Sequence, residues 1–169
     1  DLLAFDIDNG RADIARKIMS HVDPILADDG CAYFIGSTRK HTPEKPRLRL
    51  VLPLTRTVTI DEADALKRML AFRIGMSNFD QVTFRPNQVM FWPSRCIDGQ
   101  IFTQHADGPW LDPDSKLSEW YPNGWDRRES WPLHPSEDRE SLTHARKKAT
   151  DPLEKPGLVG AWCRLYSIE

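Results

Sequence analysis

Hydrophobic and polar residues alternate at the start of the chain. Leu3, Phe5 and Ile7 occupy every second position, so in an extended segment their side chains point to one face. Asp6 and Asp8 occupy the intervening positions and point to the opposite face. This period of two residues predicts a strand with one apolar and one polar face.

The period changes to that of a helix in two later segments. Apolar residues three or four positions apart predict one helix from about residue 11 to the Asp-Asp-Gly stop at 28–30. A second helix is predicted between Thr59, which precedes an acidic turn, and Gly75. Short apolar runs predict further strands at 31–37, 47–54, 82–84, 88–94 and 99–104.

The predicted order is strand, helix, strand, followed by strand, helix, strand. This is the split βαβ pattern of ferredoxin-like and RNA-recognition-motif-like α+β folds, whose helices cover one face of the sheet and leave the other open. From about residue 105 the periodicity fades and Pro, Trp, Asp and Ser dominate, which indicates an irregular extension. We therefore expect a core over 1–105, in a parent protein that begins further upstream, and an appendage and linker over 106–169.

Composition narrows the class of protein. A chain of 169 residues, 40% of them hydrophobic, is long enough for one well-filled core. The net charge of −2 argues against binding of nucleic acid through overall charge, so a polyanion needs a local basic groove. The three cysteines lack CxxC spacing, which argues against a disulfide framework or a zinc site. No apolar run reaches the length of a membrane span, and we expect a cytoplasmic protein without a membrane partner.

Asp6 and Asp8 are the first candidate functional residues. Two positions apart on a strand, their Cα atoms lie about 6.6 Å from each other and their carboxylates can converge on the same ions. Paired divalent cations held by shared carboxylates are the usual arrangement for displacement at phosphorus, and Mg²⁺ prefers such oxygen ligands. A second interpretation stays open, in which the carboxylates cap the following turn or pair with a basic side chain.

Arg47 and Arg49 alternate with leucines and therefore project from one face of their predicted strand. If the helices cover the leucine face, the arginines share the open face with Asp6 and Asp8. Arginine suits bidentate contact with phosphate, so this face carries the charges to hold a triphosphate beside a metal site. The alternative is a lattice of Asp–Arg ion pairs without a ligand.

Two further candidates lie in loops. His41, next to Lys40 in a basic loop, has the chemistry to donate to a phosphate oxygen or to transfer a proton. Asp80 precedes the short run at 82–84 and can bring a third carboxylate to the open face. On the residues alone, a solvated loop histidine and a capping aspartate are the simpler interpretations.

Three segments carry a resemblance to a known family. They are FDID at 5–8, STRKHTPEKPRLRLVLPL at 37–54 and FDQVTFRPNQVMFWPS at 79–94. In this order they resemble the three motifs of the primase-polymerase branch of the archaeo-eukaryotic primase superfamily, in the form found in phage and mobile-element primases. That family has a modified RNA-recognition-like sheet, in agreement with the predicted strand order.

The resemblance implies roles for the candidate residues. Asp6, Asp8 and Asp80 correspond to the metal-binding acids of the family, and His41 corresponds to a histidine that contacts the phosphates of the incoming nucleotide. Further nucleotide-binding cations are then expected at Lys40, Arg47 and Arg49.

The implied enzyme is a DNA primase or polymerase, a nucleotidyltransferase that uses two Mg²⁺ or Mn²⁺ ions. Its substrates would be NTPs or dNTPs, joined on a single-stranded DNA template during phage or mobile-element replication. The segment at 154–168 is similar to the one that follows this domain in phage primase-helicases. The resemblance therefore also implies a fused or associated helicase.

Two other classes of protein share the predicted sheet. A catalytically idle module would hold a single strand of nucleic acid on the open face, where aromatic residues would stack on its bases. A replication-initiator nuclease would need a paired-histidine metal motif and a tyrosine nucleophile on a helix. The histidines of this chain lack that spacing. Both classes stay as alternatives to the polymerase.

Overall fold

The computed structural model describes residues 1–8, 25–26, 30–85 and 101–139. The chain divides into two compact units, Asp1–Glu137 and Asp138–Glu169, and nearly all described residues belong to the first. The strands are β1 (Leu2–Ile7), β2 (Tyr33–Ser37), β3 (Leu48–Pro53) and β4 (Thr103–Ala106). The helices are α2 (Ile60–Ile74) and α3 (Pro113–Trp120), with short 3-10 helices η1 (Met76–Asn78), η2 (Gln81–Phe84) and η3 (Arg128–Ser130).

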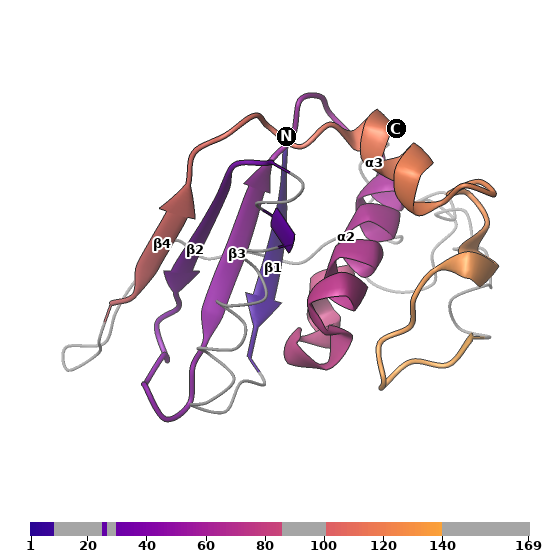
Figure 1. The fold of residues 1–169 in the computed structure, drawn as a ribbon. Coiled ribbons are helices and arrows are strands. Elements are labelled where there is room, and N and C mark those ends of the chain that lie inside the picture. The colour runs from indigo at the N-terminus through magenta and orange to yellow at the C-terminus, as the bar shows by residue number, and fades with distance from the viewer. Residues whose placement is uncertain (9–24, 27–29, 86–100, 140–169) are drawn as a thin grey trace, which may run out of the picture. The chain divides into compact units, whose positions relative to one another are not determined.

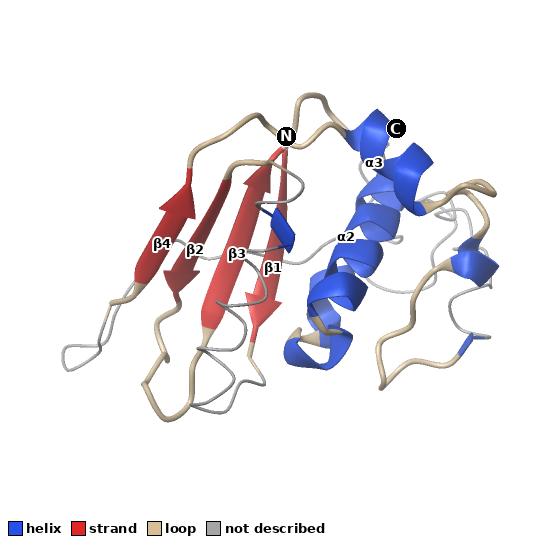
Figure 2. Ribbon diagram, viewed as in Figure 1, coloured by secondary structure: helices blue, strands red, loops and turns tan. Residues whose placement is uncertain are grey.

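The four strands form one antiparallel sheet in the order β1-β3-β2-β4 (Figure 1). Strand β3 lies between β1 and β2, which is the split arrangement that the sequence predicts. The strands form one layer and α2 lies beside β1 (Figure 2). The predicted α+β class with a ferredoxin-like sheet is therefore confirmed.

One face of the sheet belongs to the hydrophobic core. The alternate apolar residues of β1 and β3 are at most 1% exposed, namely Leu3, Phe5, Ile7, Leu48, Leu50 and Leu52. The intervening Asp6, Arg49 and Val51 are only partly buried. Because burying each large apolar side chain stabilises the fold by about 1.5–3 kcal/mol, the alternation determines which face turns inward.

Helix α2 begins and ends where the sequence predicts. Thr59 and Glu62 form a capping box, in which the Thr59 hydroxyl accepts from Glu62 N–H and the Glu62 carboxylate accepts from Thr59 N–H. Gly75 follows the last turn with φ of 120°, a value that favours glycine. Leu66 and Leu70, four positions apart, lie on the buried side of the helix.

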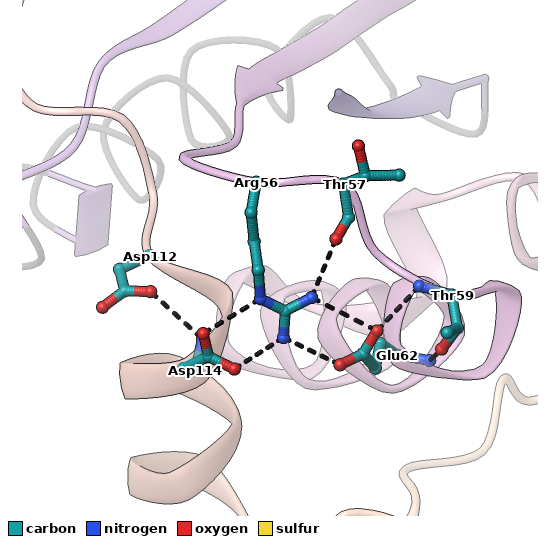
Figure 3. Close-up of polar contacts among 6 residues, drawn as sticks. All are labelled: Arg56, Thr57, Thr59, Glu62, Asp112 and Asp114. Atoms are coloured by element: carbon teal, nitrogen blue, oxygen red, sulfur yellow. Dashed lines mark hydrogen bonds and ion pairs between the residues drawn. The ribbon is translucent and has the colours of Figure 1, made fainter.

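Arg56 joins the first turns of α2 and α3 (Figure 3). Its guanidinium contacts Glu62 at 2.8 Å and Asp114 at 2.6 Å, and it donates to Thr57 O at 2.8 Å. Asp112 caps α3, because its carboxylate accepts from Asp114 N–H at 3.2 Å. Since Glu62 also closes the capping box of α2, one exposed arginine links both helix N-termini.

The expected strand at 82–84 is wrong, because this segment is the 3-10 helix η2. The Asp80 carboxylate accepts from Val82 N–H at 2.9 Å and so caps the turn. Three residues with a preference for strands are too few to compete with this local hydrogen bond. The segment nevertheless runs beside the edge of β1, where the Asp80 N–H donates to Asp6 O at 2.9 Å.

Three other predicted elements have different outcomes. The helix expected up to 28–30 and the strand expected at 88–94 lie outside the described residues. The strand expected at 99–104 is present as β4, displaced toward Ala106. It pairs with β2 at the edge of the sheet opposite β1.

Part of the predicted extension packs on the core. The Tyr121 hydroxyl donates to Ala65 O in α2 at 2.8 Å, and Trp131 is 1% exposed. The first compact unit thus continues to Glu137, beyond the core expected over 1–105. No helix in the described part of the chain is long and apolar enough to cross a membrane.

Candidate functional site

Two aspartates and two arginines form neighbouring ion pairs on the partly open face of the sheet. Asp6 of β1 lies directly opposite Arg49 of β3, and the Arg49 Nε donates to Asp6 Oδ1 at 2.8 Å. Just beyond the strand ends, the Arg47 Nη1 donates to Asp8 Oδ2 at 2.9 Å. The side chains are 15–27% exposed, so solvent reaches both pairs. The Asp–Arg pairing considered from the sequence is thus present.

The backbone of Asp6 explains the close approach of the first pair. Its N–H donates to Thr83 Oγ1 at 3.0 Å and its C=O accepts from Asp80 N–H at 2.9 Å. Both groups therefore point away from β3, toward η2. Opposite residues that do not exchange backbone hydrogen bonds bring their side chains closer together in an antiparallel pair, as Asp6 and Arg49 do.

The third acid lies next to this pair of strands. Asp80 is the N-cap of η2, and its backbone hydrogen bond to Asp6 joins the residue to β1. Asp8 senses the charges of both Asp6 and Asp80. The three acids that the sequence singled out therefore belong to one electrostatic neighbourhood.

The charge of Asp8 is disfavoured in this neighbourhood. Burial raises the pKa of the Asp8 carboxyl most strongly, Arg47 opposes this change, and the carboxylates of Asp6 and Asp80 add to it. The net direction is upward. A carboxyl with a raised pKa gains from an additional cation, which makes Asp8 the acid of this group most responsive to a metal ion.

His41 is held by the backbone that leads into β3. Its Nδ1 accepts from the Arg47 N–H at 3.2 Å, and its own N–H donates to Thr38 O at 2.9 Å. An accepting Nδ1 requires the neutral tautomer with the proton on Nε2. Burial lowers the pKa of His41, which favours this neutral form at pH 7. Lys40, its neighbour, is exposed in the same turn.

The donor chemistry of the site fits a hard divalent cation. Asp6, Asp8 and Asp80 offer oxygen atoms, which Mg²⁺ and Mn²⁺ prefer. Within the described ranges, no three His, Cys, Asp or Glu side chains are gathered closely enough to hold a metal ion. Because Arg49 and Arg47 contact Asp6 and Asp8, binding of a cation requires these contacts to be shared or released.

The comparison with family models gives one match. The model described as the VapE N-terminal domain matches residues 1–134. The chain belongs to the VapE N-terminal domain family. No curated protein and no solved structure matches it. The matched VapE N-terminal domain includes the site described above and continues past 105, through α3 and η3, to His134.

Three residues near the site were missed by sequence reasoning. Thr83 is fully buried beside β1, and Lys67 of α2 donates to Thr83 O at 3.1 Å. Phe34 in β2 is 38% exposed on the same face as the ion pairs. The alternation in 31–37 was a usable signal for Phe34, whereas nothing in the sequence pattern marks Thr83 or Lys67.

Proposed function

We propose that this domain carries out template-directed, metal-dependent nucleotidyl transfer, as a primase-polymerase does. Membership of the VapE N-terminal domain family supports a role connected with phage or mobile-element replication. The observation that carries the specific activity is the grouping of Asp6, Asp8 and Asp80 on one side of a mixed acidic and basic sheet face. The substrates are NTPs or dNTPs, the template is single-stranded DNA, and a helicase is the expected partner.

The acids have the role of metal ligands in this proposal. Asp6 and Asp8 project from one strand, and Asp80 approaches from η2. Bound Mg²⁺ or Mn²⁺ supplies positive charge that favours ionisation of a 3′-hydroxyl and stabilises the charge that develops at phosphorus. The half-buried position of the carboxylates strengthens their interaction with a cation relative to an exposed site.

The basic residues have the role of phosphate ligands. Arg47 and Arg49 already lie against the carboxylates, so a cation that takes over Asp6 and Asp8 frees the guanidinium groups for phosphate oxygens. His41 presents Nε2–H as its remaining donor, because Nδ1 accepts from the backbone. The exposed Lys40 adds a positive charge at the same end of the sheet.

Substitution of the two strand aspartates tests this function. We expect Asp6→Asn and Asp8→Asn each to lower nucleotide incorporation at least about 100-fold in a primer-extension and primer-synthesis assay with Mg²⁺ or Mn²⁺. Asp126→Asn is the matched control, since Asp126 is exposed in the loop after α3. Wild-type incorporation by both strand variants would contradict the proposal.

Phe34 favours a second candidate function, the binding of single-stranded nucleic acid without catalysis. A Cβ atom at Gly36 would lie 2.7 Å from Phe34 Cε1, so the aromatic ring rests on this glycine and leaves its other side accessible. An accessible ring on an open sheet face is a surface on which bases stack. Strand binding by the wild type, with no incorporation under any metal condition, would favour this second function.

A further inference from the structure

Thr83 fulfils the role of a neighbouring strand for Asp6. Its hydroxyl oxygen accepts from Asp6 N–H at 3.0 Å and lies 3.4 Å from Asp6 O, to which it can donate. Strand β1 is at the edge of the sheet, where backbone groups otherwise have no partner strand. The side chain of Thr83 is fully buried, so its hydroxyl depends on these contacts to satisfy its hydrogen bonds.

Thr83 is held from the opposite side as well. Lys67 of α2 reaches the Thr83 carbonyl and donates to it at 3.1 Å. The N–H of Thr83 donates to Asp80 O at 2.9 Å, which closes the turn of η2. One residue therefore connects the strand of Asp6, the turn of Asp80 and the neighbouring helix.

We propose that Thr83 is a positioning residue that places the Asp80 carboxylate relative to Asp6 and Asp8 for binding of a divalent cation. This inference rests on the proposed metal-dependent function. The turn of η2 cannot shift along β1 without breaking the contacts of both Thr83 and Asp80 with the backbone of Asp6. Residues that orient metal ligands typically change metal affinity 10- to 100-fold when they are replaced.

Amide hydrogen exchange of the wild-type protein tests the first step. We expect the Asp6 N–H to exchange slowly although β1 is an edge strand, because Thr83 Oγ1 accepts from it. In Thr83→Val the acceptor is lost at nearly constant volume, and exchange of this amide should accelerate. Unprotected exchange of Asp6 in the wild type would overturn the proposal whatever the activity of the protein.

Direct Mn²⁺ binding tests the second step. We expect Thr83→Val to bind Mn²⁺ about 10-fold more weakly or worse, measured by electron paramagnetic resonance of the free ion, and to need correspondingly more metal for half-maximal incorporation. Thr83→Ser keeps the hydroxyl and should retain wild-type affinity. Thr57→Val is the matched control, since the Thr57 hydroxyl is exposed and contacts only Asp1.

The outcomes separate the two proposals. Absence of Mn²⁺ binding by the wild type contradicts the metal site itself, and with it the proposed function. Equal Mn²⁺ affinity of the wild type and Thr83→Val overturns the role of Thr83 and leaves the metal site standing. If Thr83→Val does not fold, Thr83→Ala supplies the same comparison without placing a methyl group against the backbone of Asp6.

Thr59→Ala distinguishes positioning from general destabilisation. This substitution weakens the cap of α2, and Thr59 has no contact with Asp6 or Asp80. We expect its Mn²⁺ affinity to equal that of the wild type. An equal loss of affinity in Thr59→Ala and Thr83→Val would show that Thr83 acts through stability alone, which would overturn the proposal.

Discussion

Asp8 pairs with Arg47 at 2.9 Å, yet burial and the neighbouring carboxylates keep the pKa of Asp8 above its ordinary value. A carboxyl whose pKa is raised on folding stabilises the protein below the pKa of the unfolded chain, and this contribution is lost as pH rises through the folded pKa. At neutral pH the charge of Asp8 therefore lowers the free energy of unfolding. This cost is what a site that awaits a cation is expected to carry.

Replacement of Asp8 should consequently raise stability while it removes activity. At pH 7 we expect Asp8→Asn to raise the Tm by about 1–2 °C, a small gain because solvent screens a partly exposed charge. The gain should vanish below about pH 3.8, the ordinary value for this group, where Asp8 is protonated in both states. Calorimetry at the two pH values measures the difference, and a lower Tm for Asp8→Asn at pH 7 would contradict it.

At the residue scale, the sequence predicted the faces and not the contacts. Alternation placed Asp6 and Arg49 on the same face, because the two-residue period of a strand is fixed by its geometry. Whether they pair with each other depends on register, which comes from how β1 and β3 align. The contact of Thr83 with Asp6 joins residues 77 positions apart and depends on tertiary structure alone.

At the scale of elements, local signals were sufficient for α2 and insufficient for η2. Thr59, Glu62 and Gly75 are start and stop signals that act within the helix itself. The segment at 82–84 has the composition of a strand, but its conformation is set by the cap that Asp80 provides. The functional interpretation of Asp80 and its capping role are both compatible with the structure, since one oxygen serves the cap.

The cap of α2 has a measurable effect on the whole first unit. We expect Thr59→Ala to lower the free energy of unfolding by about 1 kcal/mol, because Glu62 N–H loses its acceptor and the reciprocal contact is weakened. Urea unfolding at neutral pH measures the change, with Thr57→Ala as the control that leaves the capping box intact. An unchanged midpoint for Thr59→Ala would show that Arg56 alone maintains this end of the helix.

At the scale of the whole molecule, the extension contributes to the core. The side chain of Arg68 in α2 is 3% exposed and contacts Glu137 at 2.7 Å as well as Asp64 at 3.1 Å. Burial raises the pKa of Glu137, but the hydrogen bond and charge of Arg68 outweigh it, so the pKa is lowered and the ionised pair is favoured. His134 also lies in this region, with Nε2 at 3.1 Å from Phe79 O. Composition suggested an irregular appendage, because these contacts are too dispersed in sequence to produce a periodic pattern.

Truncation tests how far the folding unit extends. A fragment of residues 1–139 keeps Trp131 and Glu137, and we expect it to unfold cooperatively near the Tm of the full chain. A fragment of residues 1–105 leaves Arg68 without Glu137, which costs about 3–5 kcal/mol for a buried pair, and loses the burial of Trp131, which costs a similar amount. Together these losses reach the total stability of a typical domain, about 5–15 kcal/mol, so this fragment should show no cooperative transition by circular dichroism. Cooperative unfolding of the 1–105 fragment at the temperature of the full chain would instead place the boundary where the composition changes.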